Sequence, residues 1–503
     1  MAREQWGSRT GFILAAVGSA IGLGNIWRFP YVAYDNGGGA FFVPYLFALL
    51  TAGIPLLVLE YAIGHRYRGS APLALRRISP RIEWLGWWQG AIAFVIASYY
   101  AVIIAWAVAY TWYSFTLAWG DDPDTFLFET YLQAADVGEI GGLVPAVAIP
   151  LVLVWLVTLG ILIRGVRKGI EVATRVMIPT LVVVFTILVV RAVTLPGAAE
   201  GLDALFRPDF VALGDAQVWV AAYGQIFFSL SIAFAIMVTY ASYLPPRSDL
   251  TNNAFIAGFA NSSFEVLAGI GVFAALGFIA RATGVAVDEV ATQGIGLAFV
   301  AFPQIINELP GLNALFGVIF FGCLVLAGLT SLISITEVSI AALVDKYGWR
   351  RNTAIAIGGG ACAVVSLLFS TAGGINFLDV ADSFINNFGV ALAGLVEVVL
   401  IAWVVRRLDD LQAHANAISD IRLGVWWKAC LLVVTPLVLG YQAVENVRVT
   451  VTEGYGDYPV GFLIVSGWSV AVAALVAGFI LWLPRWDAAA LAASDADLQE
   501  AWR

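Results

Sequence analysis

Apolar runs of about 20 residues recur along the whole chain and are separated by shorter polar segments. A helix of that length crosses a hydrocarbon core of roughly 30 Å, because an α-helix rises about 1.5 Å per residue. A transmembrane β-barrel would instead show alternating strands of about ten residues. The pattern therefore predicts an all-α integral membrane protein with twelve transmembrane helices, at residues 10–34, 40–65, 87–118, 144–163, 171–195, 217–244, 252–280, 312–344, 353–370, 376–405, 423–445 and 459–483.

Two of these spans, the first and the sixth, are interrupted by small or polar residues at mid-membrane depth, at positions 18–25 and 231–235. Non-helical backbone at this depth must be buried or line a wet cavity, so the interruptions indicate broken helices around a central site. Close packing of small residues is the alternative interpretation of the first interruption. The second contains alanines, which favour helix, so propensity alone does not predict a break there.

The spacing of the interruptions, from the first span to the sixth, fits two repeats of five helices each. An odd number of helices per repeat inverts the second repeat relative to the first. We therefore predict an N-terminal segment at 1–9, an inverted-repeat core at 10–406 with repeats at about 10–195 and 217–406, helices eleven and twelve at 422–483, and a tail at 484–503.

Lysine and arginine are distributed unevenly between the loops. Most of the 26 basic residues fall in segments that lie on the same side as the termini, whereas the loop at 119–143 is acidic and has none. Because positive residues are retained on the cytoplasmic side, both termini are predicted to be cytoplasmic and the protein to reside in the inner cell membrane.

Composition agrees with a membrane solvent and excludes several classes of protein. The 503 residues are 61% hydrophobic and 12% charged, with a mean hydropathy of +0.87, so the lipid bilayer is the expected surrounding. The net charge of -9 makes nucleic acid an unsuitable partner. The three cysteines lie in apolar runs and both histidines, His65 and His414, in predicted cytoplasmic loops, which leaves an intramembrane enzyme without a metal cluster or a nucleophile and base pair.

Charged residues inside the predicted spans are costly and are therefore functional candidates. They are Arg28, Glu60, Glu265, Glu337, Asp382 and Glu397. Arg28 and Asp382 are both expected on the outer side of the central break, where they form either an ion-pair gate or simply a snorkelling arginine and a helix-start aspartate.

A set of oxygen-bearing side chains accompanies the breaks, namely Asn25, Ser229, Asn261, Thr330 and Ser331. Together with backbone carbonyls freed by the first break they suit a hard cation such as Na⁺, which needs oxygen ligands. Each hydroxyl alone is more simply explained by a bond to its own helix backbone. Only their coincidence with the broken helices favours an ion site.

Several segments resemble the neurotransmitter:sodium symporter family, including its bacterial amino-acid carriers. They are GLGNIWRFP at 22–30, NGGGAF at 36–41, IASYY at 96–100, GQIFFSLS at 224–231 and AGLTS at 327–331. The resemblance runs in order over nearly the whole chain, and it implies the inverted-repeat fold with broken helices 1 and 6. It also implies a sodium-coupled symporter of a small or apolar amino acid that works by alternating access.

The resemblance implies two sodium sites. The first uses the Ala20 carbonyl, Asn25, Ser229 and Asn261, completed by the substrate carboxylate. The second uses the Gly18, Ile21 and Ala327 carbonyls with Thr330 and Ser331. If substrate and ion share a ligand, their binding is coupled reciprocally.

The resemblance also implies a substrate pocket and two gates. Its lining is Ser19, Gly22, Gly24, Ile96, Tyr100, Phe228, Ser229, Ser231, Ala233, Phe234, Ser331 and Ile335. Gly22 stands where amine carriers of the family have aspartate, which implies a substrate that brings its own carboxylate, and Tyr100 is implied to bind that group. Arg28 with Asp382 is implied as the outer gate above a lid of Phe228 and Tyr100, and Arg3, Trp6, Tyr243 and Asp345 as the cytoplasmic gate.

The resemblance implies a role for two further features of the sequence. Glu265 lies one helical turn after Asn261, where chloride-dependent members have serine, which implies transport without chloride. Gly169 and Pro179 resemble an element of the fifth helix that unwinds to admit water to the second sodium site.

Departures from the family pattern leave the substrate open. Ser19 replaces an asparagine found in amino-acid carriers, and Ala233 and Ala235 replace glycines. Their extra methyl groups are expected to narrow the pocket or to stiffen the turn, which favours a small substrate such as alanine, glycine or valine. An ω-amino acid or a betaine also brings a carboxylate, so the same fold could carry either.

The residues also permit two different functions on the same scaffold. One is transport coupled to protons through Glu60, Glu265 or Glu397 instead of Na⁺. The second is a membrane sensor or channel that transports nothing, which the intact ion ligands and both gates disfavour. A homodimer is a further expectation of the sequence.

Overall fold

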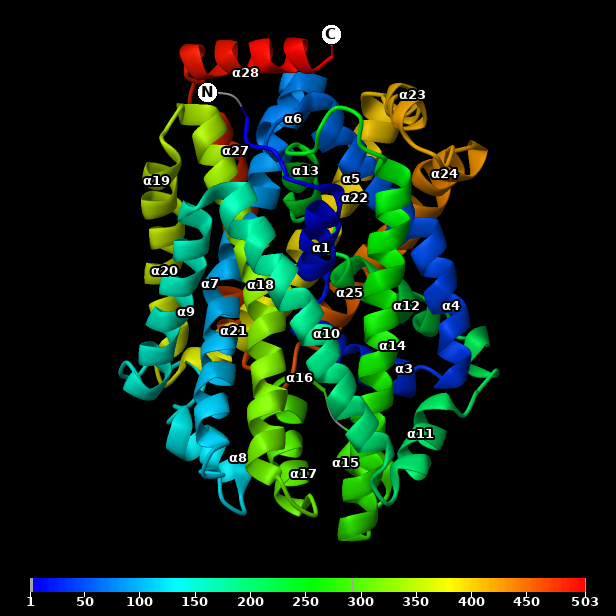
Figure 1. The fold of residues 1–503 in the computed structure, drawn as a ribbon, viewed down its shortest axis with the longest axis vertical. Coiled ribbons are helices and arrows are strands. Elements are labelled where there is room, and N and C mark those ends of the chain that lie inside the picture. The colour runs from blue at the N-terminus through cyan, green and yellow to red at the C-terminus, as the bar shows by residue number, and fades with distance from the viewer. Residues whose placement is uncertain (1–2, 292, 503) are drawn as a thin grey trace.

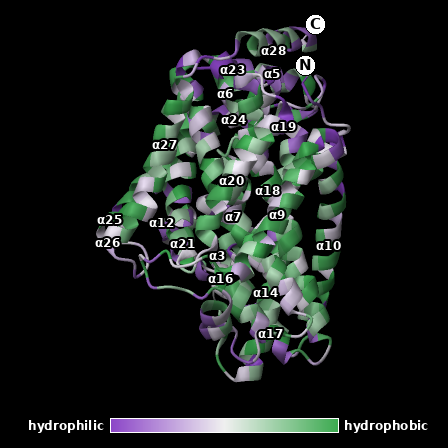
Figure 2. Cartoon of the chain, turned by 90° about the vertical axis from the view of Figure 1, so that its left-hand side faces the viewer, coloured by the Kyte–Doolittle hydropathy of each residue, from purple (hydrophilic) through white to green (hydrophobic). Residues whose placement is uncertain are grey.

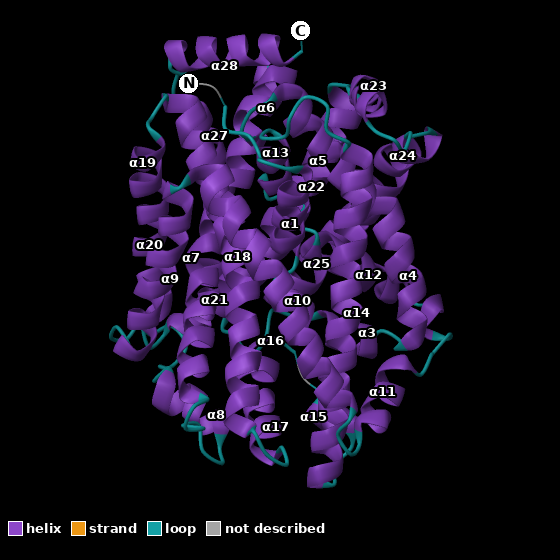
Figure 3. Cartoon of the chain, viewed as in Figure 1, coloured by secondary structure: helices purple, strands orange, loops and turns teal. Residues whose placement is uncertain are grey.

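The computed structural model describes residues 3–291 and 293–502, which form helices joined by loops (Figures 1 and 3). In this described part there is no strand, and the only strand-like pairs are the isolated bridges Gly38 with Pro208 and Leu143 with Thr371. Within a bilayer every backbone N–H and C=O must find a partner inside the protein, and a helix satisfies them within one segment. The predicted all-α class is confirmed.

Ten helical segments are long and apolar enough to span a membrane, and each matches a span predicted from the sequence. They are Gly39–Tyr67, Pro80–Tyr113, Pro145–Ile163, Val166–Val193, Leu250–Thr283, Asn313–Tyr347, Arg351–Ser370, Gly374–Val404, Val425–Thr452 and Val460–Trp482. The boundaries shift by a few residues, most at the third span, which begins at Pro80 instead of 87.

The labelled helices within these segments are α4 (Phe42–Ala48), α5 (Ile54–Tyr67), α7 (Glu83–Tyr113), α9 (Pro145–Ile163), α10 (Glu171–Val193), α14 (Leu250–Thr283), α18 (Asn313–Tyr347), α19 (Arg351–Ala354), α20 (Gly360–Ser366), α21 (Gly374–Phe384), α22 (Ala391–Val399), α24 (Val425–Ala429), α25 (Thr435–Thr452), α26 (Val460–Leu463) and α27 (Ser469–Trp482). The connecting helices are α6 (Ala71–Ile78), α8 (Pro123–Thr125), α11 (Ala198–Phe206), α15 (Val287–Val290), α16 (Gly294–Gly296), α17 (Phe302–Glu308), α23 (Leu408–Ile418) and α28 (Ala488–Ala501).

The first span is broken, as predicted. Helix α1 (Arg9–Ala20) begins at Ser8, whose hydroxyl accepts a bond from the Gly11 N–H, and ends where Ile21 turns extended. Helices α2 (Leu23–Trp27) and α3 (Phe29–Asp35) continue the path at an angle of 55°. Gly22 allows Tyr100 and Ser331 to approach the bend closely, because a Cβ there would lie 3.1 Å from the Tyr100 hydroxyl and 3.2 Å from Ser331 Oγ.

The sixth span is broken more completely than helix propensity indicates. Helix α12 (Ala216–Ser229) and helix α13 (Ile236–Ala241) are separated by residues 230–235. Three side-chain-bearing residues in this stretch, Ser231, Ala233 and Ala235, have φ of 54°, 64° and 62°. An L-residue in this left-handed region costs roughly 1 to 2 kcal/mol, so contacts elsewhere must hold the break in place.

The count of twelve spans is not established. Ten segments and the bent first pair qualify by length and composition, which gives at most eleven in the described residues. The sixth predicted span is divided into two short helices by its break, and neither half is long enough to meet the same criterion.

Both described ends of the chain lie at one end of the bundle, which we call the terminal face (Figure 1). Hydrophilic residues gather there, around α5, α19 and α23, while the middle of the bundle is largely hydrophobic (Figure 2). Helix α28 lies across this face and is attached to it. Its Asp495 pairs with Arg77 at 2.7 Å, and its Asp497 accepts a bond from the Arg3 main-chain N–H at 3.2 Å.

His65 does not lie in a loop, contrary to the prediction. It is buried in the last turn of α5, and its Nδ1 lies 3.0 Å from Nε2 of His414 on α23. Trp502 packs edge-on against both rings. Burial, with neighbouring His65 and Arg66, lowers the pKa of His414 from its usual value to about 3.

This lowered pKa predicts a pH dependence of stability. Below about pH 6.5 the histidine is protonated in the unfolded chain but stays neutral in the fold, so the free energy of unfolding falls as the pH is lowered. Above that pH the histidine is neutral in both states and causes no such loss of stability. We expect the melting temperature to fall as the pH is lowered from about 7.5 to about 5, and His414→Asn to make this fall shallower. Parallel pH curves for the two proteins in thermal denaturation would contradict the assignment.

Candidate functional site

The two breaks enclose a cavity of about 110 Å³ near the middle of the bundle. Helix α7 contributes Ile96 and Tyr100, and α18 contributes Ser331 and Ile335. The cavity is lined by Ser19, Ala20, Gly22, Leu23, Gly24, Asn25, Trp27, Ile96, Tyr99, Tyr100, Ile103, Phe228, Ser229, Ser231, Phe234, Ile236, Ser331, Ile335, Asp382 and Asn386. The structure thus brings together every residue of the expected pocket except Ala233.

Ala233 faces away from this cavity. Its methyl group points towards Gly394 of α22, and its N–H donates a bond of 2.7 Å to Glu60 Oε1. Neither Ala233 nor Ala235 lines the cavity. The expectation that these methyl groups narrow the pocket is therefore wrong, because successive residues of the break point in different directions.

One side of the cavity is polar. The Tyr100 hydroxyl accepts a bond of 3.3 Å from the Leu23 N–H, and the start of α2 presents Gly22 and Gly24 without side chains. A Cβ on Gly24 would lie 2.6 Å from the Phe228 ring. Phe228 therefore packs directly over the bare backbone at Gly24.

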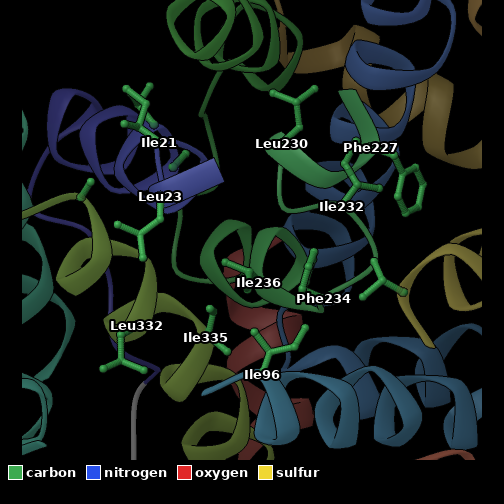
Figure 4. Packing of buried hydrophobic residues seen from close by; sticks show 14 of the residues in the cluster. Ile21, Leu23, Ile96, Phe227, Leu230, Ile232, Phe234, Ile236, Leu332 and Ile335 are labelled. Atoms are coloured by element: carbon green, nitrogen blue, oxygen red, sulfur yellow. The ribbon is translucent and has the colours of Figure 1, made fainter. Parts of the chain in front are cut away.

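The opposite side is apolar and is formed by Ile96, Phe234 and Ile335 (Figure 4). At its edge the Ser334 hydroxyl donates a bond of 2.8 Å to Ser19 Oγ, and the Ser231 hydroxyl donates one of 3.0 Å to the Ser19 carbonyl. A molecule with a charged end and an apolar end fits this arrangement.

The first predicted group of ion ligands lies next to the polar side. The Asn25 amide donates to Asn261 Oδ1 at 2.8 Å, and the Asn261 amide donates to Ser229 Oγ at 3.0 Å. These three residues come from α2, α14 and α12, so they meet only because the breaks bring the helices together. All three are buried.

The second predicted group is centred on Ser331. Its Oγ lies within 3.5 Å of four carbonyl oxygens, those of Gly18, Ser19, Ile21 and Ala327. A serine hydroxyl has one proton to donate, so it cannot satisfy all four of these oxygens. Thr330 adds a further hydroxyl, 2.9 Å from the Ala327 carbonyl. A buried concentration of oxygen of this kind suits a hard cation such as Na⁺.

Glu265 is buried beside the first group and is surrounded by donors. The Tyr45 hydroxyl donates to one carboxylate oxygen, and the Gln225 amide donates to the other at 2.7 Å. The Tyr45 hydroxyl also lies 2.8 Å from Ser262 Oγ. The surroundings are thus arranged to hold one negative charge.

A larger cavity of about 590 Å³ lies beyond Phe228, on the side away from the terminal face. Arg28 and Asp382 both line it, but they do not pair with each other. The Arg28 guanidinium stacks over the Phe228 ring, 4.7 Å from its centre, and Asp382 accepts bonds from Tyr99 and Asn386. Both remain at the mouth of the central cavity, and the ion pair is not formed in this state.

The terminal face is closed by the four residues predicted as the cytoplasmic gate. Arg3 pairs with Asp345 at 3.0 Å and lies over the Tyr243 ring. Trp6 is buried, and its indole N–H donates to the Tyr240 carbonyl at 2.8 Å. The structure therefore shows the central cavity sealed at the terminal face, whereas on the other side Phe228 lines both this cavity and the larger outer one.

Two buried glutamates have contacts that their positions in the sequence did not reveal. Glu60, a charged functional candidate and a possible proton carrier by sequence, accepts the Ala233 N–H freed by the sixth-helix break. Glu337 accepts a bond from the Tyr243 hydroxyl and pairs with Arg351 at 2.6 Å, which extends the closed gate. Their place in apolar spans marked them as functional, but nothing in the sequence identified their partners.

The predicted flexible element of the fifth helix is wound here. Gly169 lies in the π-helical turn Val166–Ile170, and Pro179 lies within α10. Gly169 allows close packing, because a Cβ there would lie 2.1 Å from the Ile161 carbonyl.

Comparison with known proteins assigns the chain to a family. The model of the sodium:neurotransmitter symporter family matches residues 3–137 and 125–486. The chain belongs to the sodium:neurotransmitter symporter family. It is therefore a sodium-dependent, multi-pass membrane transporter, and the family is not one of enzymes.

Individual members show how far the likeness extends. An uncharacterized sodium-dependent transporter of Methanocaldococcus jannaschii is 42% identical over 477 residues, which cover 95% of this chain and 97% of that protein. The human sodium- and chloride-dependent taurine transporter is 32% identical over 522 residues, covering 94% and 83%, and the rat GABA transporter 2 is 31% identical over 531 residues, covering 96% and 86%. The crystal structure of MhsT in complex with L-phenylalanine superposes with a TM-score of 0.74 at 32% identity, covering 88% of this chain and all of MhsT.

The contacts at the closed terminal face of this symporter predict how strongly Arg3 holds the N-terminal segment. Arg3→Ala removes the ion pair with Asp345 and two bonds to Ser242 Oγ, so residues 3–8 should detach more often. Because a charge-assisted contact contributes on the order of 1 to 2 kcal/mol, amide exchange in this segment should rise about tenfold. Hydrogen–deuterium exchange by mass spectrometry measures it, with Arg350→Ala as control. Unchanged exchange would show that Arg3 does not hold the segment.

Proposed function

We propose that this symporter couples the inward movement of Na⁺ to the uptake of an apolar α-amino acid by alternating access. The observation that carries the proposal is the meeting of four carbonyl oxygens around the single Ser331 hydroxyl, next to a cavity with one polar and one apolar side. The termini and the closed terminal face are taken as cytoplasmic, in line with the positively charged loops.

The proposed roles follow from the contacts. The substrate carboxylate lies beside Tyr100 and the bare backbone at Gly22, and the side chain lies among Ile96, Phe234 and Ile335. One Na⁺ binds at Asn25, Ser229, Asn261 and the Ala20 carbonyl, close enough to the carboxylate for each to favour the other. A second Na⁺ binds at Thr330, Ser331 and the Gly18, Ile21 and Ala327 carbonyls, and links α1 to α18.

Alternating access then consists of exchanging one closed side for the other. In this state the cytoplasmic gate of Arg3, Trp6, Tyr243 and Asp345 is closed, and the outer cavity meets the pocket at Phe228, which lines both. Outer closure brings Arg28 and Asp382 together over Phe228 and Tyr100. Opening at the cytoplasmic side breaks the Arg3 pair and unwinds the segment around Gly169.

The second candidate substrate is an ω-amino acid. Relatives named as GABA and taurine transporters favour it, since such substrates also carry an acid group for the polar side. The apolar lining of the opposite side favours the α-amino acid, because an ω-ammonium group would lie unpaired against Ile96 and Ile335.

Uptake into proteoliposomes tests the proposal. With an inward Na⁺ gradient, a labelled panel of apolar α-amino acids should accumulate, and replacement of Na⁺ by K⁺ should abolish the accumulation. GABA, taurine and glycine betaine form the contrasting panel, and a pH gradient without Na⁺ tests proton coupling. Accumulation of none of these compounds, or equal uptake without Na⁺, would overturn the proposal.

A matched pair of variants tests the second ion site within the same assay. Ser331→Ala removes the hydroxyl at the carbonyl cluster and should raise the half-saturating Na⁺ concentration by about tenfold, roughly 1.4 kcal/mol. Thr336→Ala removes a buried hydroxyl further along α18, bonded only to Leu332, and should leave the Na⁺ dependence unchanged.

We further propose that the Glu265 carboxylate replaces chloride. The Tyr45 and Gln225 donors that surround it are suited to one negative charge, whether fixed or mobile. A fixed charge makes an anion in solution unnecessary.

Replacement of this charge should restore an anion requirement. Transport by the native protein is expected to be equal in chloride and gluconate, whereas Glu265→Ser should transport only with chloride. A loss of about 2 kcal/mol of charge-assisted bonding predicts at least a tenfold slower rate in gluconate. Chloride dependence of the native protein would contradict this assignment.

A further inference from the structure

A second polar cavity, of about 410 Å³, opens at the terminal face and shares no residue with the transport site. It lies beside the N-terminal segment, at the start of the fifth span. Its lining is Gly7, Arg167, Lys168, Glu171, Val172 and Arg175. Three cationic side chains therefore meet a single carboxylate.

That carboxylate is fully engaged with the protein. Glu171 is buried and accepts bonds from the Gly7 N–H at 2.6 Å and the Ser8 hydroxyl at 3.0 Å, and it pairs with Arg175 at 2.8 Å. Arg167 and Lys168 are exposed, and over residues 3–291 and 293–502 neither side chain forms a hydrogen bond or ion pair. The cavity thus presents two uncompensated positive charges to its surroundings.

The cavity lies at the polar end of an apolar span, where the headgroups of a bilayer are expected to meet its hydrocarbon. Arg167 and Lys168 stand in the first turn of the span Val166–Val193. Below them, Val172 and Val176 of α10 are 53% and 63% exposed and continue to the exposed Val183. Because this face of α10 is apolar and uncovered, it is a surface for lipid tails directly beneath the cationic cavity.

We propose that this cavity binds the headgroup of an anionic phospholipid from the cytoplasmic leaflet. The phosphate bonds to Arg167, Lys168 and Arg175, and the acyl chains follow Val172, Val176 and Val183. A free anion would satisfy the same cations but would gain nothing from the apolar face. Arg167, Lys168 and Arg175 could also serve only to keep this end of the span on the cytoplasmic side. That role does not require the charges to line a cavity.

Such a lipid has a mechanical consequence for the gate. The backbone at Gly7 packs against Arg167 so closely that a Cβ would lie 2.9 Å from its Nε. Trp6, the residue before Gly7, is buried and closes the terminal face. A phosphate held by Arg167 therefore supports the N-terminal segment in its closed position, and the lipid stabilises the closed state.

The test is a thermal-shift titration of the full chain in detergent with phosphatidylglycerol, phosphatidylcholine or inorganic phosphate at matched ionic strength. Phosphatidylglycerol alone should stabilise the protein, with saturation. Arg167→Gln with Lys168→Gln should raise its half-saturating concentration about fivefold per charge removed, roughly 25-fold in all. Arg350→Gln, which removes an exposed arginine elsewhere on the terminal face, should leave it unchanged.

A further variant serves as the control for folding and for charge. Arg167→Lys with Lys168→Arg keeps both charges and should restore the native response. Equal stabilisation by phosphatidylcholine, or an unchanged response of the double glutamine variant, would overturn the proposal. Equal stabilisation by inorganic phosphate would do the same, because it would show an anion site without a lipid.

Discussion

The structure depends on backbone polar groups that two broken helices leave without helical partners inside a membrane. Unpaired groups in hydrocarbon are too costly to remain, so each must be bonded within the protein or offered to a ligand. At the sixth-helix break the protein supplies the partner, since Glu60 accepts the Ala233 N–H. At the first break the carbonyls of Gly18 and Ile21 face a hydroxyl that has only one proton to give. The unpaired acceptors are what make the centre of the bundle receptive to cations.

The two ends of the central cavity are closed by different kinds of contact. The terminal face is held by a charge pair, a buried indole and the docked helix α28, which joins residues far apart in the sequence. At the opposite end the Phe228 ring lies under the Arg28 guanidinium, and Asp382 accepts bonds from Tyr99 and Asn386. At the terminal face the Arg3–Asp345 pair is formed, whereas at the opposite end Arg28 and Asp382 do not pair. A lipid bound in the polar cavity at Arg167, as we propose, would add a further contact to the terminal face.

Much of the fold was predictable from the sequence, because a bilayer restricts the chain to long apolar helices. The first break was also predictable, since glycine and asparagine are placed where the backbone must leave the helix. The sixth break was not predictable from propensity, because alanine at φ of 62° to 64° is imposed by the surroundings and not by the residue. The resemblance to the family supplied it instead.

The candidate site likewise was predictable in part from the sequence. Residues such as Tyr100 and Ser331 could be placed by motif, and they do meet at one cavity. Side-chain direction within an irregular segment could not be predicted, which is why Ala233 was wrongly assigned to the pocket. Partners distant in sequence, such as Tyr99 for Asp382 or His414 for His65, also required the three-dimensional arrangement.

The left-handed backbone at Ser231, Ala233 and Ala235 also limits how this transporter can evolve. β-Branched or bulky residues are disfavoured at such dihedral angles, so mutation at these positions is confined to glycine and a few small or amide-bearing residues. Two of the three positions, moreover, do not reach the cavity. A change of cargo is therefore expected at residues that line the cavity, such as Gly22, Ile96 or Phe234. Ala233 and Ala235 thus hold the shape of the break, while the side chains that reach the cavity set the shape of the pocket.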